Sequence, residues 1–222
     1  MCGRYMLARD AQSLAAEFGI AAPEQLAPRY NIAPTQPTLI VREEEKRRVA
    51  MLVRWGLVPF WADDIAIGQR MINARAETVA DKPAFRAAFR RRRCLVPADG
   101  YYEWQTRNGR KQPYWISATD SHCFGLAGLW ESWQRDGNEL QTMSLMTCAA
   151  NQRLSEIHDR MPVIIERQHY TTWLASETPL VALQALLRPA ANETVVMRAV
   201  STRVNSARND GPACIEPLAQ SS

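Results

Sequence analysis

The chain has 222 residues, which suits one large domain or two small ones. Hydrophobic residues make up 46% and charged residues 23%, the balance of a soluble globular protein, and the formal net charge of +4 permits a nucleic-acid partner without requiring one. No apolar run approaches the roughly 20 residues of a membrane helix and no basic-then-apolar segment opens the chain, so we expect a cytoplasmic protein without membrane contact.

The first half of the chain mixes helices, strands and loops. Residues 10–19 (DAQSLAAEFG) predict a helix with Asp10 as N-cap and Gly19 just past its end. Four prolines between residues 21 and 37 predict a loop. PTLIV (37–41) and RVAMLVRW (48–55) predict two strands joined by a charged turn. Residues 55–64 predict an aromatic-rich loop, and 81–93 (DKPAFRAAFRRRR) predict a helix ending in four arginines.

Short strands dominate the second half. They are expected at CLVPA (94–98), YYEWQ (101–105), QPYWIS (112–117), CFGLAGLW (123–130), LQTMSLMTC (140–148) and TVVMRAV (194–200). Asn108-Gly109 between the second and third is typical of a hairpin turn. Helices are expected near 166–176 and 179–187, and a polar tail from about 210. Antiparallel strands with segregated helices predict an α+β fold, whereas a doubly wound sheet would need regular βαβ alternation.

The five cysteines stand at positions 2, 94, 123, 148 and 214. Their number is odd and no C-x-x-C pair occurs, so we expect neither a disulfide framework nor a zinc site. The three histidines show no i, i+4 ligand spacing, and we expect no metal and no cofactor. Cys94, Cys123 and Cys148 lie in or beside apolar runs and fit buried positions, whereas Cys2 has no such run around it.

Cys2 has a chemistry of its own if Met1 is removed. Its α-amine and thiol would then sit on adjacent carbons, and an α-amine with a pKa near 7.7–8.0 is partly neutral at cellular pH. A neutral amine attacks an aldehyde to give a Schiff base, and the neighbouring sulfur can close on the imine carbon as a five-membered thiazolidine ring. The alternative is a chance cysteine that is unprocessed or inert.

Three further motifs offer chemistry. MINARAET (71–78) places Asn73 and Arg75 on one face of an extended segment, where an exposed strand edge is the alternative. PADGYYEWQ (97–105) flanks Glu103 with aromatic residues that could raise its pKa, although a surface glutamate would look the same. EIHDRMP (156–162) sets His158 beside Asp159 and Arg160, which suits an acid–base group next to a phosphate contact.

Basic and aromatic residues interleave along the chain. Such mixtures bind single-stranded nucleic acid, with bases stacked on rings and arginines following the backbone. Core packing accounts for most of the seven tryptophans, and FRRRR (89–93) fits a solvated helix end. The interleaved residues are Arg4, Arg29, Tyr30, Arg54, Trp55, Trp61, Arg75, Trp104 and Arg160.

Six motifs in one order carry a family resemblance. MCGRY, RYNIAPTQ, RWGLVPFW, INARAET, CLVPADGYYEW and IHDRMPVI strongly resemble the SOS response-associated peptidase (SRAP) family, from residue 1 to about 210. The resemblance implies one SRAP-type α+β domain over residues 1–222, with curled, mainly antiparallel sheets and flanking helices. Members of that family crosslink covalently to abasic sites in single-stranded DNA and shield the lesion during replication, and some reverse the link.

The resemblance also implies roles for single residues. Cys2 would be the nucleophile, and Asn73 would hold its amine and the opened sugar. Glu103 would orient or deprotonate the amine and assist reversal, and His158 would move the proton that opens the sugar ring. Arginines would contact phosphates, other residues would line the DNA channel and one tryptophan would act as a wedge. These DNA-binding residues are Arg4, Asn31, Pro34, Trp61, Arg75, Thr147 and Arg160.

The sequence departs from the family pattern at two places. Some members carry two adjacent tryptophans where this chain has Phe60 and Trp61, and some have an arginine where Pro83 stands, which Lys82 could replace with less specific geometry. The resemblance further implies lyase-like chemistry, self-processing at Met1, replication-fork components as partners, and a nucleoid-associated monomer. Two rival functions stay open: an N-terminal-cysteine peptidase or amidohydrolase, and a noncovalent reader of single-stranded or modified DNA.

Overall fold

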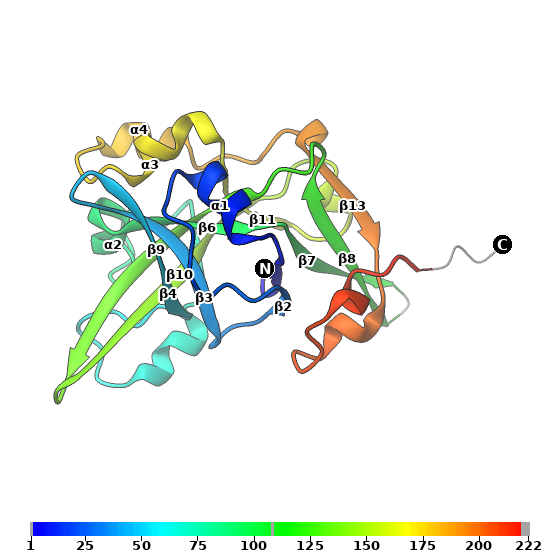
Figure 1. Ribbon diagram of the computed structural model, residues 1–222, viewed down its shortest axis with the longest axis horizontal. Helices are drawn as coiled ribbons and strands as arrows, with labels where there is room; N and C mark the ends of the chain where they lie inside the picture. Colours follow the sequence, from blue (N-terminus) through cyan, green and yellow to red (C-terminus); the bar gives the residue numbers. More distant parts are fainter. Residues whose placement is uncertain (1, 108, 219–222) are drawn as a thin grey trace.

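Two β-sheets sharing one hydrophobic core form the body of the protein. The computed structural model describes residues 2–107 and 109–218 (Figure 1). A five-stranded sheet, ordered β13-β8-β7-β1-β2, lies on the right of Figure 1, and an eight-stranded sheet on the left. The five-stranded sheet contains β1 (Tyr5–Leu7), β2 (Arg29–Ile32), β7 (Gly100–Arg107), β8 (Arg110–Ala118) and β13 (Val195–Ala199).

The eight-stranded sheet curls until it closes. Its path runs β11-β10-β4-β3-β6-β9-β12, β5 pairs with β10, and an additional pairing of β10 with β9 completes a barrel-like ring. Only the β10–β4 and β10–β5 pairings are parallel among those described, so the predicted α+β fold with curled, mainly antiparallel sheets is confirmed. Its strands are β3 (Pro37–Glu44), β4 (Arg47–Trp55), β5 (Asn73–Arg75), β6 (Arg93–Ala98), β9 (Phe124–Arg135), β10 (Asn138–Ala149), β11 (Arg160–Pro162) and β12 (Ile164–Ile165).

Short helices flank the sheets. The α-helices are α1 (Ala11–Phe18), α2 (Arg86–Arg91), α3 (Tyr170–Leu174) and α4 (Leu180–Ala185). The 3₁₀ helices are η1 (Ile65–Arg70), η2 (Leu154–Glu156), η3 (Arg167–His169), η4 (Asn192–Thr194), η5 (Thr202–Asn205) and η6 (Pro212–Cys214). The predicted caps of α1 are confirmed: Asp10 accepts from the Ser13 backbone N–H, and Gly19 has a φ of 65°.

Two local predictions were wrong. The proline-rich loop contains β2, which pairs with β1 because Pro28 and Pro34 fall outside the paired residues. The helix expected to end in four solvated arginines stops early, and Arg93 begins β6 with only 2% of its surface exposed. Its guanidinium donates to the carbonyls of Phe89 and Trp173 at 2.8 and 2.6 Å, and burial lowers the pKa of Arg93 to about 10.

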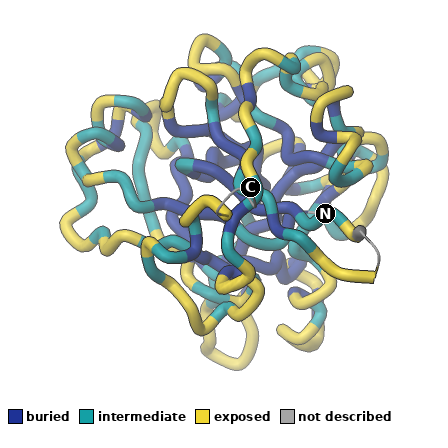
Figure 2. The backbone as a smooth tube through the Cα atoms, turned by 90° about the vertical axis from the view of Figure 1, so that its right-hand side faces the viewer, coloured by how far each residue is buried: buried dark blue, intermediate teal, exposed yellow. Residues whose placement is uncertain are grey.

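The core runs without a break from one sheet to the other. Tyr5 and Tyr101 of the five-stranded sheet belong to the same buried cluster as Val41 and Leu95 of the eight-stranded sheet. Figure 2 shows the buried backbone gathered in the centre and the exposed loops around it. All five cysteines are free and buried. A shared core fixes the spacing between the two sheets, and therefore between residues that different sheets bring to one place.

Candidate functional site

Strand β1 holds Cys2 in place. β1 lies between β2 and β7, with Tyr5 opposite Tyr101, and the Tyr102 backbone N–H donates to the Arg4 carbonyl at 3.0 Å. The residues before β1 therefore run alongside β7 towards Glu103. Cys2 is fully buried, and its thiol lies 3.9 Å from the Arg4 carbonyl oxygen. Burial, followed by the nearby charge of Glu103, raises the pKa of this thiol.

Asn73, from the eight-stranded sheet, hydrogen-bonds to the backbone of Cys2. It is the first residue of β5 and pairs with Leu145 of β10, and its Nδ2 donates to the Cys2 carbonyl at 3.0 Å. The Oδ1 atom of the same amide is buried and has no hydrogen-bond partner among the described residues. The amide thus holds the backbone of Cys2 with one atom and presents an acceptor with the other.

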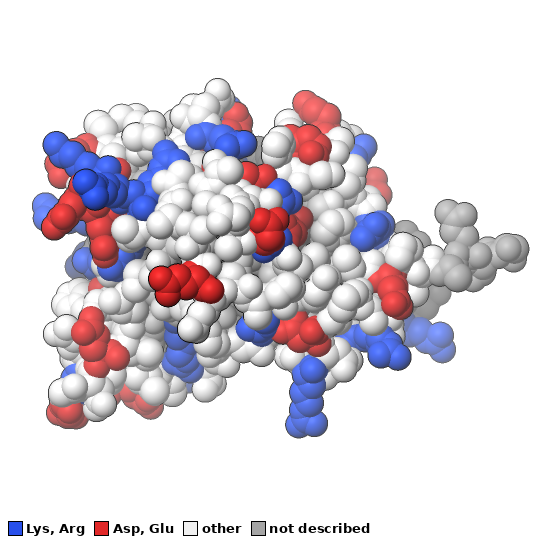
Figure 3. Space-filling view, viewed as in Figure 1, with Lys and Arg blue, Asp and Glu red and all other residues white. Residues whose placement is uncertain are grey.

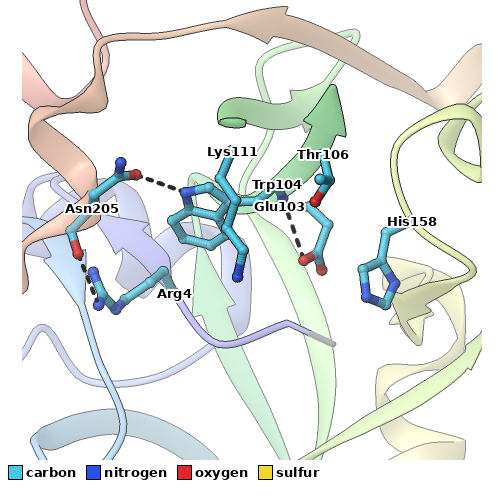
Figure 4. A pocket seen from close by; sticks show the side chains of 7 residues that line it. All are labelled: Arg4, Glu103, Trp104, Thr106, Lys111, His158 and Asn205. Carbon is cyan, nitrogen blue, oxygen red and sulfur yellow. Dashed lines mark hydrogen bonds between the residues drawn. The ribbon is translucent and has the colours of Figure 1, made fainter. Parts of the chain in front are cut away.

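Glu103, whose charge acts on the Cys2 thiol, lines a polar cleft of about 600 Å³, and neither Cys2 nor Asn73 is among the lining residues. The cleft is lined by Arg4, Glu103, Trp104, Thr106, Lys111, His158 and Asn205. Figure 4 shows the Glu103 carboxyl and the His158 ring side by side at one end of the cleft, with Arg4 and Asn205 at the other. Glu103 is only 6% exposed, and burial raises the pKa of its carboxyl while the nearby His158 lowers it.

Two contacts at Nδ1 indicate which ring nitrogen of His158 carries the proton. The Arg160 backbone N–H donates to Nδ1 at 3.0 Å, while Asp159 Oδ1 lies 2.9 Å from the same atom. The two contacts require opposite states of Nδ1. The backbone N–H has a fixed direction, whereas the Asp159 side chain is 86% exposed and free to rotate, so we assign Nδ1 as the acceptor. The proton of the neutral ring then resides on Nε2.

Arg4 is anchored at the far end of the cleft. Its guanidinium donates to Asn31 Oδ1 at 3.1 Å, to the Val204 carbonyl at 2.9 Å and to the Asn205 carbonyl at 3.4 Å. Asn31, which the sequence placed along a DNA channel, is fully buried, and its Nδ2 donates to the carbonyls of Val204, Ser206 and Asn209. Its side chain therefore positions Arg4 and the chain around η5 instead of facing solvent.

Three other expected DNA-binding residues meet where β5, β10 and β11 run together. Arg75 is exposed and lies opposite Thr147 in the register of β5 and β10. Thr147 is fully buried, and its carbonyl accepts from Arg160 Nη2 at 2.7 Å. Arg160 is also bound to Glu77, through Nη1 at 2.6 Å and Nη2 at 2.9 Å. This cluster lies outside the lining of the cleft.

Pro34 and Trp61 also lie outside the lining of the cleft. Pro34 is half-buried in the turn between β2 and β3. Trp61 is 49% exposed and its neighbour Phe60 is 59% exposed, in the loop that follows β4. Two adjacent aromatic side chains with this much exposed surface are available for stacking against a ligand.

Sequence reasoning missed several residues of the cleft. Lys111 stands opposite Thr106 in the β7–β8 hairpin, so the register of the predicted hairpin could have found both. Asn205 could not be found this way, because it reaches Trp104 only through the fold, where its Oδ1 accepts from the indole N–H at 2.7 Å. Glu77 stood in the quoted motif INARAET but received no role.

Charge and composition add three observations on the described part of the chain. Basic and acidic side chains are interspersed on the face drawn in Figure 3. Within residues 2–107 and 109–218, no group of three or more His, Cys, Asp and Glu residues could hold a metal ion. No described helix is both long and apolar enough to cross a bilayer.

Comparisons with known proteins agree on one family. The family model for SOS response associated peptidase (SRAP) matches residues 1–207. The abasic site processing protein YoqW of Bacillus subtilis (strain 168) is 40% identical over 223 residues, which is 97% of this chain and 99% of YoqW. The abasic site processing protein HMCES of Gallus gallus is 35% identical over 225 residues, covering 86% of this chain and 66% of its own. A crystal structure of a protein from Bacteroides thetaiotaomicron matches with a TM-score of 0.90 at 25% identity, covering 98% and 100% of the two chains.

Proposed function

Because the chain belongs to the SOS response-associated peptidase family, we propose that it processes abasic sites in single-stranded DNA by attaching them covalently to Cys2 after Met1 has been removed. The relatives named abasic site processing proteins support the DNA-lesion role. One observation carries the chemistry: Asn73 holds the Cys2 backbone at 3.0 Å, and Glu103, which lines the cleft together with His158, is close enough for its charge to act on the Cys2 thiol.

The first chemical step is to open the closed sugar of the lesion. The abasic ring shows an aldehyde only when the bond between C1′ and the ring oxygen breaks. The ring oxygen must then receive a proton while the C1′ hydroxyl loses one. His158 is the group for this exchange, because Nδ1 accepts the Arg160 backbone N–H and the ring proton on Nε2 can be offered to the ring oxygen.

Attack by the Cys2 amine follows. Its nitrogen adds to the aldehyde carbon, and loss of water gives an imine. Glu103 accepts the proton that the amine must lose and returns it to the departing hydroxyl. A carboxyl whose pKa is raised by burial exchanges protons closer to neutral pH than an exposed glutamate does. The unpartnered Oδ1 of Asn73 accepts an N–H from the same amine and aims it at the carbonyl carbon.

Ring closure completes the adduct. The Cys2 sulfur bonds to the imine carbon, the C=N double bond becomes single, and the nitrogen gains a proton. Because burial raises the pKa of the thiol, its sulfur stays protonated until this step. The thiol proton therefore passes to the imine nitrogen within the site. The product is a neutral five-membered thiazolidine.

Recognition cannot rely on a base, because the lesion has none. Phosphate contacts by Arg4, Arg75 and Arg160, with stacking of neighbouring bases on Trp61, give binding with little sequence preference. Half-buried Pro34 belongs to the same proposed surface. Asn31 and Thr147 are fully buried and support it by accepting hydrogen bonds from Arg4 and Arg160. With about three arginines on phosphates, the logarithm of affinity falls with the logarithm of salt concentration at a slope of about −2.

We propose that the same residues also carry reversal of the adduct, lyase activity and self-processing at Met1. In reversal, the C–S bond opens to the imine as Glu103 donates a proton, and water then adds to the imine carbon and releases the amine. In a Schiff base that never closes, loss of a proton from C2′ expels the 3′ phosphate and cleaves the strand. We further propose that residues 1–222 form a single domain that acts as a monomer. In this proposal it works with replication-fork components at the nucleoid.

A crosslinking assay tests the proposed function. Purified protein is mixed with a single-stranded oligonucleotide that carries one abasic site and analysed on a denaturing gel and by intact mass. We expect an adduct on Cys2, with Met1 absent. Cys2→Ala abolishes the adduct, whereas Cys123→Ala, which removes another free and buried cysteine, retains it. An adduct that survives Cys2→Ala refutes the proposal, and DNA-independent turnover of unrelated peptides would favour a peptidase instead.

A further inference from the structure

The guanidinium of Arg160 is already engaged in a bidentate contact. Nη1 and Nη2 donate to the two carboxylate oxygens of Glu77 at 2.6 and 2.9 Å, and Nη2 also donates to the Thr147 carbonyl at 2.7 Å. The remaining Nε–H is buried and has no partner among the described residues. The two-pronged edge of the guanidinium that would grip a phosphate is therefore occupied by a carboxylate.

A carboxylate and a phosphate compete directly for such an edge. Both present two oxygen acceptors in one plane, and both bind arginine through two parallel N–H contacts. The pairing lowers the pKa of Glu77 and raises that of Arg160, as expected when each side chain stabilises the charge of the other. A phosphate can take both donors of Arg160 only when Glu77 has left.

We propose that Glu77 occupies the position of a DNA phosphate on Arg160 and is displaced when single-stranded DNA binds, so that Glu77 sets the affinity of this contact. The inference rests on the proposed DNA-binding function. The residues proposed above strengthen DNA binding, and Glu77 would be one that weakens it.

The surroundings of the pair determine which partner moves. The Glu77 side chain is 50% exposed and follows the end of β5, so it can rotate into solvent. The Arg160 side chain is only 15% exposed, its backbone pairs with Ala149 of β10, and its Nη2 is bound to Thr147. Arg160 stays in place while Glu77 swings away. The exposed guanidinium of Arg75 stands two residues before Glu77, and the same phosphate backbone can reach it.

The competition has a consequence for non-specific binding. Any single strand can displace Glu77, since the contact reads a phosphate and not a lesion. Glu77 therefore lowers affinity for undamaged DNA in the same proportion as for damaged DNA before the covalent step. Once the adduct has formed, the covalent bond holds the strand, and this loss of affinity no longer matters.

Fluorescence anisotropy with a labelled, undamaged single-stranded oligonucleotide tests the inference without the covalent step. We expect Glu77→Gln to bind about fivefold more tightly than the wild type, equivalent to about 1 kcal/mol. In an Arg160→Gln background the same change should shift affinity less than about twofold, since the competed donors are gone. Glu166→Gln, which removes one negative charge from another surface ion pair, with Arg188, is the matched control and should also shift affinity less than about twofold.

Each result decides the matter. Weaker binding by Glu77→Gln overturns the inference, because Glu77 would then orient Arg160 for DNA. Unchanged binding also overturns it, because Glu77 would then not compete with the phosphate. An equal gain in the Arg160→Gln background also overturns it, because Glu77 would then act by general repulsion. Arg160→Lys, which keeps the charge without the two-pronged edge, replaces Arg160→Gln if thermal melting shows that the latter does not fold. A wild type that forms the adduct but shows no gain on Glu77→Gln sinks this inference alone, whereas a wild type that neither binds nor crosslinks sinks the proposed function.

Discussion

Replacing Asn73 with alanine should separate catalysis from stability. The variant loses the 3.0 Å bond to the Cys2 carbonyl, a loss worth about 0.5–1.5 kcal/mol. It also removes the buried, unpartnered Oδ1, whose desolvation costs about 1–3 kcal/mol in the folded state. The two effects have opposite signs, so the free energy of unfolding should change by between a loss of about 0.5 and a gain of about 2.5 kcal/mol. For a chain of this length that is a shift in Tm of no more than about 10 °C.

The rate of adduct formation should respond far more strongly. Without the amide, neither the backbone nor the amine of Cys2 is aimed at the sugar carbon, and a misplacement of about 1 Å costs about 100-fold in rate. Single-turnover crosslinking on denaturing gels measures the rate, anisotropy measures binding of undamaged DNA, and thermal melting measures stability.

Thr119→Val is the control for Asn73→Ala. Thr119 Oγ1 donates to the Glu193 carbonyl at 2.7 Å, outside the lining of the cleft, so its removal also deletes one side-chain contact to the backbone. This variant should crosslink at the wild-type rate. The reasoning fails if Asn73→Ala crosslinks within a factor of about three of the wild type, since a positioning group would then not be needed.

Three further predictions concern the carboxylate, the wedge and the salt dependence. Burial raises the pKa of Glu103, so the folded state binds its proton more tightly than the unfolded state does, and stability is lost as pH rises through the folded pKa. Glu103→Gln should therefore raise Tm at neutral pH, leave it unchanged in acid below the unfolded pKa and slow adduct formation; a lower Tm at neutral pH would contradict this. Trp61→Ala should weaken binding of single strands by about 1–3 kcal/mol with Tm nearly unchanged, because the indole is 49% exposed; anisotropy and melting measure the two effects. A salt titration of undamaged-strand binding should give a slope near −2, and Arg75→Ala should reduce its magnitude by about 0.7; an unchanged slope would show that Arg75 contacts no phosphate.

Much of the local structure could be predicted because it depends on neighbours in sequence. The caps of α1, and the strands β3 and β4 with their charged turn, follow from residue type and spacing alone. Tertiary packing decides the rest. Nothing near Arg93 shows that its guanidinium turns inward to the carbonyls of Trp173 and Ala175, and nothing near Asn31 shows that it will hold the chain around η5.

The candidate site shows the same division. Cysteine chemistry alone made Cys2 a candidate, but only the family resemblance joined it to Asn73, Glu103 and His158. The structure adds the way in which they meet: Asn73 arrives from the eight-stranded sheet and Glu103 from the five-stranded one. The ion pair of Glu77 with Arg160 is invisible in sequence, because 83 residues separate its partners.

The backbone contacts around Cys2 suit the nucleophile that we propose. Chain ends usually fray, and a mobile amine would lose most of the advantage of proximity. Here β1 is paired on both sides, by β2 and β7, and the Cys2 carbonyl is held from the opposite sheet by Asn73. Folding therefore orders the backbone of the proposed nucleophile in advance, and the proposed mechanism leaves the conformational adjustment to the DNA.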